Sequence, residues 1–295
     1  MNFYGKDLKV WKANLHTHTT VSDGFFTPEQ VAFTYERGGY DVLFLTDHRR
    51  TNDVTCFADR KIRVYSGIEL HPTGPRGIPW HILGLGVPRD FDGQPATGQA
   101  AVDAVNTAGG VAFVAHPYWC GFTSAEVMSL RGTAGIEVYN TSTRYIGKDY
   151  NMQLWDEMLD AGATPTALAV DDVHNFHDFF RGWTMICAEE NTYESILGAL
   201  KSGSFYASQG PRFEKLSLEG RKFEAEFTEA VSAVLLTNRS MGFCGTVPGE
   251  PFPSDATTTT HLAADLSKLP SGSYIRCQIR DAAGRYAWSN PVRID

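Results

Sequence analysis

Histidine is distributed unevenly along this chain of 295 residues, because eight of its nine histidines lie within the first 177 positions. Nine side chains in this part of the chain stand in motifs typical of metal ligands: His16, His18, Asp23, His48, Glu69, His81, His116, Asp172 and His174. Imidazole and carboxylate together are the usual ligands of zinc, manganese and iron. Nine ligands are too many for one ion. The sequence therefore predicts a cluster of two or three divalent metals and metal-assisted hydrolysis.

Strand-like and helix-like segments alternate up to about residue 205. Thr27-Pro28 is typical of a helix start and Gly38-Gly39 of a helix end. The apolar run 41–46 that follows predicts a strand buried on both faces. The pattern recurs, with helices predicted near 99–108, 124–130 and 150–161 and strands at 111–115, 136–139 and 165–170. This alternation predicts parallel strands with crossover helices.

Candidate ligands stand directly after predicted strands, as His48 does after the run 41–46 and His116 after the run 111–115. In a parallel barrel the carboxyl ends of the strands share one face, and that face carries the active site. Ligands far apart in sequence would therefore converge. Asp47, beside His48, is predicted to be structural or to hold a ligand by a hydrogen bond.

Two pairs of candidate ligands have a spacing of two residues. His16 and His18 form one pair, and Asp172 and His174 form the other. Side chains alternate along an extended chain, so both members of a pair can reach one ion. By the same alternation, the neighbouring Asp171 is expected to point away from the site.

The sequence pattern changes after about residue 208. Residues 211–295 contain no histidine motif, and short segments alternate apolar with polar side chains. This pattern predicts a small antiparallel β module. We therefore predict two domains, a metal-dependent hydrolase barrel at 1–208 and a small β domain at 209–295, and we expect no metal ligand beyond residue 208.

Composition restricts the class of protein. The net charge of −8 and the lack of a basic run argue against a large nucleic acid as partner. No apolar stretch has the length of a membrane span, and the N-terminal residues have no apolar signal core. The five cysteines are odd in number and scattered, as expected of reduced core residues in a cytoplasmic protein. The oligomeric state stays open.

The ordered ligand set resembles the polymerase and histidinol phosphatase (PHP) family of metal-dependent phosphoesterases, over about residues 10–180. The resemblance implies a distorted (β/α)7 barrel, similar to a TIM barrel, with a site for up to three metals. It implies a first metal held by His16, His18, Glu69 and Asp172, a second by Glu69, His81 and His116, and a third by Asp23, His48 and His174. Motifs at 11–18, 208–211 and 287–291 also make the whole chain similar to a carbaryl-hydrolase-like branch of metallohydrolases.

The family resemblance implies a phosphoesterase that acts on a small phosphorylated metabolite or nucleotide. A metal-bridging hydroxide, held through the metals of Glu69 and Asp172, would attack phosphorus. Three carboxylates against three divalent ions and one hydroxide leave the site at about +2, which favours an anionic substrate. The first alternative is a carbamate, ester or amide hydrolase on the same metals. The second is a non-enzymatic binding module in which the metals only stabilise the fold.

Three side chains near the ligands are candidates for substrate binding: His71, Arg144 and His177. Of these, Arg144 has the guanidinium group that can bind a phosphate bidentately. Tyr118 and Trp119 are candidates for a wall that stacks on a base or ring. For each of the five, an ordinary loop or core position is an equally open interpretation.

Overall fold

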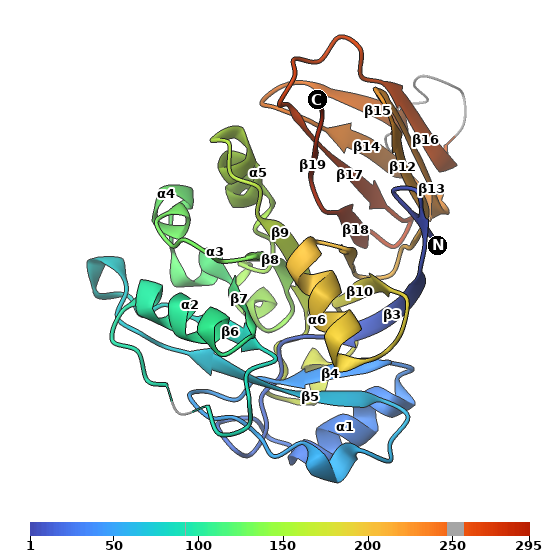
Figure 1. Cartoon of the computed structure of the whole chain (residues 1–295). Coiled ribbons are helices and arrows are strands. Elements are labelled where there is room, and N and C mark those ends of the chain that lie inside the picture. Colours follow the sequence, from blue (N-terminus) through green and yellow to red (C-terminus); the bar gives the residue numbers. More distant parts are fainter. Residues whose placement is uncertain (92, 247–256) are drawn as a thin grey trace.

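The first two thirds of the chain build a mixed α/β sheet surrounded by helices, in a computed structural model that describes residues 1–91, 93–246 and 257–295 (Figure 1). The strands of this sheet are β3 (Lys9–Asn14), β4 (Val42–Leu45), β5 (Arg63–Leu70), β6 (Ile82–Leu85), β7 (Val111–Val114), β8 (Gly135–Asn140), β9 (Thr166–Val170), β10 (Trp183–Ala188) and β11 (Phe205–Ser208). Their order in the sheet is β11-β10-β3-β4-β5-β6-β7-β8-β9. Every residue of β4 and β7 is buried, as their continuous apolar sequences predict.

Helices cover the outer surface of this sheet. They are α1 (Pro28–Arg37), α2 (Gly98–Thr107), α3 (Pro117–Cys120), α4 (Ser124–Met128), α5 (Met152–Asp160) and α6 (Tyr193–Ser202), with short 3-10 turns η1 (Thr55–Phe57), η2 (Pro75–Gly77), η3 (Ser142–Ile146) and η4 (Phe176–Asp178). The start of α1 is as predicted, because Thr27 caps it and exchanges hydrogen bonds with Gln30 in a capping box. The predicted helices near 99–108, 124–130 and 150–161 are confirmed as α2, α4 and α5.

The strands of the sheet are not all parallel, and the prediction of a uniformly parallel sheet is wrong at two places. β3, β4 and β5 are parallel, and so are β7, β8 and β9. Between these two groups, β6 runs antiparallel to both β5 and β7. At the other end, β10 runs antiparallel to β3 and to β11. The segment 71–81, which leads from β5 to β6, contains no helix longer than η2, so it makes a return connection instead of a crossover.

The sheet does not close into a hydrogen-bonded barrel among the described residues, because the path of paired strands ends at β9. β10 lies beside β9, and the Thr184 hydroxyl donates to the Ala169 carbonyl at 3.0 Å. Both backbone edges of β10 are already paired, with β3 and with β11. At the outer edge of β9, the Ala167 N–H instead donates a hydrogen bond to a side chain, the amide oxygen of Asn290, at 2.9 Å.

The last third of the chain forms the predicted β module. Its strands are β12 (Phe213–Glu219), β13 (Lys222–Ala230), β14 (Ser232–Leu236), β15 (Gly242–Thr246), β16 (Thr259–Asp265), β17 (Tyr274–Arg280), β18 (Tyr286–Ser289) and β19 (Val292–Arg293). Pairing among these strands is antiparallel. The N-terminal strands β1 (Asn2–Phe3) and β2 (Lys6–Asp7) join this module, because β1 pairs in parallel with β12.

The β module lies next to the mixed sheet (Figure 1). Backbone pairing and buried side chains join the two parts. β18 pairs with β11, so one path of strands continues from the module into the sheet. Arg276 is buried in β17, and its guanidinium donates two hydrogen bonds of 2.7 Å to Asp156 of α5. Trp288 of β18 packs into the same hydrophobic cluster as Trp155 of α5. The division at 208 stays a prediction, and these contacts cross it.

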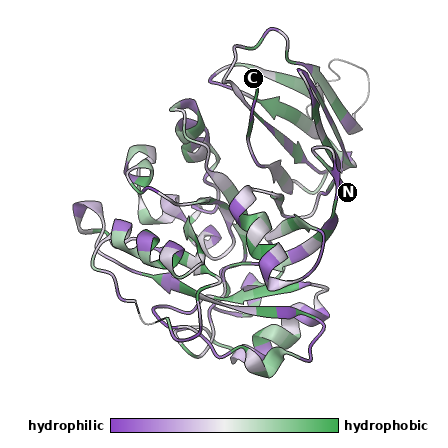
Figure 2. Cartoon of the chain, viewed as in Figure 1, coloured by the Kyte–Doolittle hydropathy of each residue, from purple (hydrophilic) through white to green (hydrophobic). Residues whose placement is uncertain are grey.

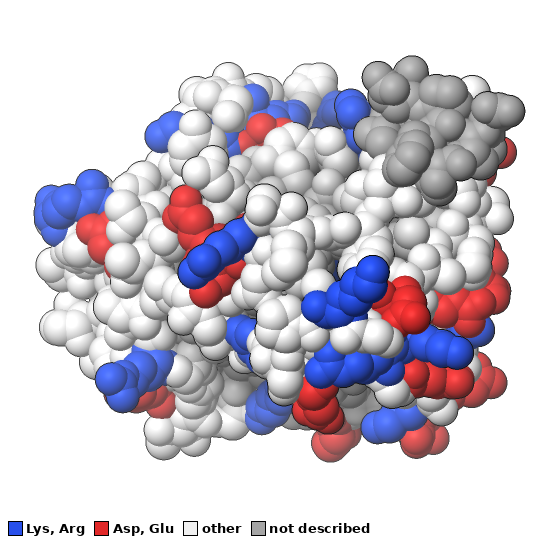
Figure 3. Space-filling model, turned by 90° about the horizontal axis from the view of Figure 1, so that it is seen from above, with Lys and Arg blue, Asp and Glu red and all other residues white. Residues whose placement is uncertain are grey.

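Figure 2 shows green apolar residues along many strands, whereas helices alternate green and purple residues. On the face seen in Figure 3, Lys and Arg are interspersed with Asp and Glu and form no field of one sign. The five cysteines are free thiols, and the expectation that they are core residues holds for Cys187 and Cys277 but not for the exposed Cys56. No helix in the described ranges has the length and apolar character needed to cross a membrane.

Candidate metal centre

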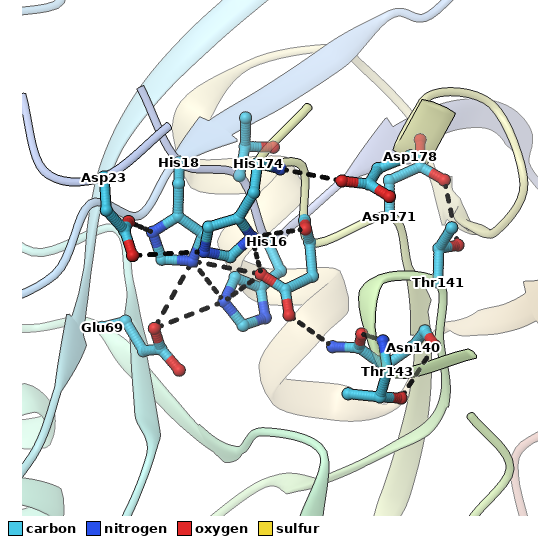
Figure 4. Close-up of polar contacts among 12 residues, drawn as sticks. His16, His18, Asp23, Glu69, Asn140, Thr141, Thr143, Asp171, His174 and Asp178 are labelled. Atoms are coloured by element: carbon cyan, nitrogen blue, oxygen red, sulfur yellow. Dashed lines mark hydrogen bonds and ion pairs between the residues drawn. The ribbon is translucent and has the colours of Figure 1, made fainter. Parts of the chain in front are cut away.

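All nine side chains predicted as metal ligands come together at one end of the mixed sheet, around a pocket of about 270 Å³. Figure 4 shows five of them close together: His16, His18, Asp23, Glu69 and His174. Seven of them line the pocket: Asp23, His48, Glu69, His81, His116, Asp172 and His174. His16 and His18 lie beneath them and are buried. The structure therefore brings together residues that are up to 158 positions apart in the chain, from His16 to His174.

Strand direction explains how these residues converge. The histidine pair after β3, His48 after β4 and the pair after β9 all stand at the carboxyl ends of parallel strands. His81 instead precedes β6. Because β6 is antiparallel to β5, its first residue Ile82 pairs with Leu70, the last residue of β5. The reversed strand thus places His81 beside Glu69 at the same edge of the sheet.

Four side chains surround the centre of the cluster. The Nε2 atoms of His16 and His18 lie 3.3 and 3.1 Å from Oδ1 of Asp172. The same two nitrogens lie 3.6 and 3.4 Å from Oε2 of Glu69. They are 3.0 Å from each other. Two nitrogens and two carboxylate oxygens thus face one point, which is the arrangement expected of a four-ligand metal position.

A second group of ligands shares Glu69 with the first. The Nδ1 atom of His81 lies 2.8 Å from Oε1 of Glu69, and the Nε2 atom of His116 lies 3.4 Å from the same oxygen. Glu69 therefore presents one carboxylate oxygen to each of the two groups. A carboxylate in this position can bridge two cations.

The third group lies on the open side of the pocket. Oδ2 of Asp23 is 3.3 Å from Nε2 of His48 and 3.5 Å from Nε2 of His174. Asp23 is half-exposed, with 54% of its side chain accessible, whereas Glu69 is fully buried. The turn that carries Asp23 is fixed by Asp47, which accepts hydrogen bonds from Thr19 and Ser22.

The cluster fits divalent cations because its buried oxygens lack partners that could neutralise them by hydrogen bonding. Oε2 of Glu69 and Oδ1 of Asp172 are buried and accept no hydrogen bond within the described protein. Burial by itself raises the pKa of both carboxyls, but the surrounding imidazoles, His16 first among the charges, hold each pKa well below its ordinary value. Two anionic carboxylates among imidazole nitrogens form the donor set of zinc, manganese or iron.

The outer histidines are electrostatically coupled to these carboxylates. Burial lowers the pKa of His48 and His174, but their carboxylate neighbours, beginning with Asp23, raise each pKa to about 9. The protons that they hold in the metal-free protein occupy the positions where cations would bind. Metal binding at this group is therefore expected to displace protons.

Glu137 is a functional residue that our sequence analysis missed. It lies in β8 and is fully buried; its Oε1 accepts from Nδ1 of His16 at 2.6 Å, and its Oε2 accepts from the His116 backbone N–H and the Asn140 amide, both at 2.8 Å. The bond to Nδ1 fixes the tautomer of His16 and directs its Nε2 lone pair toward the cluster. The signal was present, since Glu137 is the one charged residue of the buried strand Gly135–Asn140.

Asp47, predicted to be structural or to hold a ligand, accepts hydrogen bonds from Thr19, Ser22 and Asn52. Asp171, expected to point away from the site, is held by backbone N–H groups. Asp171 accepts hydrogen bonds from the backbone of Phe180, Arg181 and Gly182, and burial raises its pKa to about 6. Its neighbour Asp172 has a φ of 51°, in the left-handed region that non-glycine residues rarely adopt. This turn directs Asp172 into the pocket while Asp171 anchors the loop behind it.

Of the three predicted substrate contacts, one lies beside the metal cluster and two do not line its pocket. His71 lies beside the cluster, with Nε2 at 3.4 Å from Oε2 of Glu69. Arg144 does not line the pocket, because its guanidinium donates to the buried Asp178 at 2.8 Å and to the backbone carbonyls of Thr141 and His177. The His177 side chain is exposed at the surface and does not line the pocket.

The predicted aromatic wall is present in part. Trp119 lines the metal pocket and stands edge-to-face against His116, with ring centroids 5.1 Å apart. Tyr118 instead lines a separate cavity with Phe122 and Tyr150. Ser142 and Thr143, which the sequence analysis did not select, complete the pocket wall.

One known protein is similar to part of this chain. No family model matches the chain. Phosphoribosyl 1,2-cyclic phosphate 1,2-diphosphodiesterase from Eggerthella lenta is 38% identical over 88 residues, which are 28% of this chain. The chain spans about a third of that relative, since the match covers 32% of it.

One solved structure is similar to this chain over almost its whole length. The crystal structure of a two-domain protein from Bacteroides vulgatus, containing a predicted PHP-like metal-dependent phosphoesterase, aligns with a TM-score of 0.57 at 16% identity. The alignment covers 98% of this chain and 96% of that one. Two other solved structures align less well. They are an amidohydrolase from Chromobacterium violaceum with bound sulfate and no metal (TM-score 0.45, 19% identity, 55% of this chain and 87% of that one) and the lesion-specific endonuclease PfuEndoQ from Pyrococcus furiosus (TM-score 0.46, 14% identity, 66% and 56%).

The fold of the chain is shown by these similarities, but the branch of metallohydrolases to which it belongs is not. The mixed sheet and the β module together form a fold shared with the Bacteroides protein along both chains. The PHP-like resemblance is supported at the level of the fold. Membership in the carbaryl-hydrolase-like branch is not confirmed and stays a prediction, as does a cytoplasmic location.

Proposed function

We propose that this protein is a metal-dependent phosphoesterase that acts on a small phosphorylated metabolite or nucleotide. The position of Glu69 carries the proposal, because this fully buried carboxylate presents one oxygen to each of two ligand groups. A carboxylate shared in this way is expected of an enzyme that uses neighbouring metals together. Support also comes from the partial relative, which is named as a diphosphodiesterase.

We assign the metals as the family resemblance implies. The first metal would be held by His16, His18, Glu69 and Asp172, the second by Glu69, His81 and His116, and the third by Asp23, His48 and His174. The first two groups are buried except for His81, whose side chain is 12% exposed, whereas the third contains the half-exposed Asp23. The third position is therefore expected to exchange its metal most readily.

The chain's own residues would orient the metals and the substrate. Glu137 holds His16 and the backbone of His116, so two ligand groups share one support. Metals bound here would supply a nucleophile at neutral pH and neutralise charge that develops on phosphoryl oxygens. Trp119, Ser142 and Thr143 bound a pocket of about 270 Å³, which suits a phosphoryl group with a small part of its leaving group.

A substrate panel and metal analysis would test this function. Protein purified without added metal should contain two or three divalent ions per chain, as manganese, iron or zinc, by mass spectrometry. The same protein should hydrolyse p-nitrophenyl phosphate or its phosphodiester faster than p-nitrophenyl acetate and p-nitrophenyl carbamates. Faster cleavage of the ester or carbamate at full metal content would instead establish the alternative hydrolase, and metal without any turnover would favour the binding module.

A further inference from the structure

A second cavity, of about 550 Å³, opens directly beside the metal pocket. Its walls are Val21, Ser22, Asp23, His48, Arg49, Arg50 and His71. Two of these side chains, Asp23 and His48, also line the metal pocket. The cavities therefore share a wall made of proposed ligands of the third metal. A substrate whose phosphoryl group lies over the metals can extend across this wall.

The backbone fixes the two arginines relative to the cluster. The Arg49 N–H donates to the carbonyl of Glu69 at 2.8 Å, and its φ of 58° lies in the left-handed region. Strain of this kind persists where the surroundings determine the conformation, and it is concentrated at functional sites. Arg50 follows immediately, and its N–H faces the Asp47 carbonyl at 3.4 Å. Both side chains thus leave a turn that is hydrogen-bonded to the backbone of Glu69.

The two adjoining cavities differ in their cationic side chains. The residues that line the metal pocket include no lysine or arginine. Arg144, the cation predicted to bind phosphate, is held by Asp178. Arg49 and Arg50 line the second cavity, are exposed, and form no ion pair within the described ranges of the chain. A second anionic group on the substrate would therefore meet cationic side chains in this direction.

We propose that Arg49 and Arg50 form a subsite for a second anionic group of the substrate, a phosphate or a carboxylate, while the scissile phosphoryl group lies over the metals. The inference rests on the proposed function and specifies its substrate class, a small phosphoester with two anionic groups. Guanidinium groups suit this role because they bind phosphate and carboxylate through paired hydrogen bonds. The recognition is by charge, so it weakens as ionic strength rises.

Calorimetric titration of the metal-loaded full chain tests the subsite without requiring turnover. Butane-1,4-bisphosphonate and butylphosphonate differ by one anionic group, and neither is hydrolysed. The wild type should bind the bisphosphonate about 10-fold more tightly or better, because a second charge-assisted contact forms. The Arg49→Gln/Arg50→Gln double variant should retain a preference of about 2-fold, the statistical advantage of two identical ends. Arg50→Lys should keep most of the wild-type preference because it keeps the charge.

Two controls separate the arginines from other effects. Arg239→Gln removes an exposed arginine of the β module and should leave the preference unchanged. Chelation of the metals by the bisphosphonate acts alike on every variant, so the difference between variants reports the arginines. Titration with 5-phosphonopentanoate, which replaces one phosphonate by a carboxylate, shows which second anion is preferred.

An unchanged preference in the double variant, or equal binding of the two phosphonates by the wild type, would overturn the subsite. Hydrolysis of p-nitrophenyl phosphate is measured separately and reports the proposed function. A protein that hydrolyses this ester but shows no arginine-dependent preference retains the function and loses the subsite. A protein with the preference but no phosphoesterase activity retains the anion subsite and loses the function.

Discussion

The metal pocket and the β module differ in the kind of side chain that fills their buried positions. Around the pocket, fully buried positions are held by charged side chains, among them His16, Glu69 and Glu137. Inside the β module, most buried positions are apolar, and one cluster includes Phe213, Phe223, Phe227, Leu235, Leu262 and Ile279. The core of the module is thus an ordinary hydrophobic one, whereas the pocket is a network of buried charges.

This difference has a consequence for substitutions. An apolar core loses stability in proportion to the volume removed and keeps its fold when neighbours relax. A buried polar network depends on every partner, because a group left without its hydrogen bond or counter-charge carries its full desolvation cost. Single substitutions should therefore abolish function at the pocket and mainly change stability at the module.

The largest effect is expected at Glu69. Glu69→Gln keeps the shape of the side chain but removes the charge shared by two ligand groups. Turnover of the best phosphoester should become undetectable, and metal content should fall below two ions per chain, because both metals lose an anionic ligand. Mass spectrometry and a phosphate-release assay measure the two outcomes. Full metal content with near-normal turnover would contradict the assignment of Glu69 as a bridge.

The next effect is expected at Glu137, which touches ligands but is not one of them. Glu137→Gln keeps one acceptor but removes the charge that holds Nδ1 of His16. Metal affinity should fall by about 10- to 100-fold, the usual cost of losing such a support. Competition with a chromogenic chelator measures this affinity. Glu229→Gln, at an exposed site in the β module, is the matched control, and equal affinities in the two variants would remove Glu137 from the site.

The sequence identified side chains that the structure brings together, because metal chemistry restricts which side chains can serve as ligands. His48 and His116 stand directly after strands, and strand ends can be recognised from apolar runs. The α1 boundaries were recognisable because Thr27 and Gly38 carry strong end signals. Helix-end and strand-end signals of this kind are set by neighbouring residues in the sequence, so they depend little on the rest of the fold.

Features that depend on strand partners could not be read from the sequence. The reversal of β6 leaves no local mark, since a buried strand reads as the same apolar run in either direction. The pairing of β1 with β12 joins residues that are more than 200 positions apart. Arg144 was a reasonable phosphate ligand by position, but its pairing with Asp178 depends on how two loops meet. Contacts between residues far apart in the sequence determine the direction of β6, the pairing of β1 and the partner of Arg144.

A smaller effect, on stability alone, is expected where the module meets the sheet. Arg276 is buried, stacks on Trp155 and donates twice to Asp156. Arg276→Ala should destabilise the protein by about 2–4 kcal/mol, because Asp156 keeps its charge without a partner. The midpoint of thermal unfolding should fall by roughly 5–10 °C, while the metal content of the folded protein stays unchanged.

A double variant sharpens this prediction. Replacing both partners, in Arg276→Met/Asp156→Leu, should restore part of the lost stability, since an apolar pair avoids the unpaired charge. An additive or greater loss in the double variant would show that the contact with Trp155, and not the ion pair, provides the stabilisation. Metal loss in either variant would contradict the separation between pocket and module.

The smallest effect is expected at His261, the one histidine outside the first 177 residues. It lies in β16, half-exposed, and its Nε2 is 3.1 Å from Oε1 of Glu224 on the neighbouring strand β13. An exposed pair of this kind contributes between zero and about 1 kcal/mol, because water and salt screen it. His261→Ala should therefore leave metal content and turnover unchanged and shift unfolding only slightly. His116→Ala, by contrast, should lose metal from the buried second group, so the two histidine variants assayed side by side test whether metal binding is confined to the pocket. Loss of metal in His261→Ala would show that the module takes part in the site.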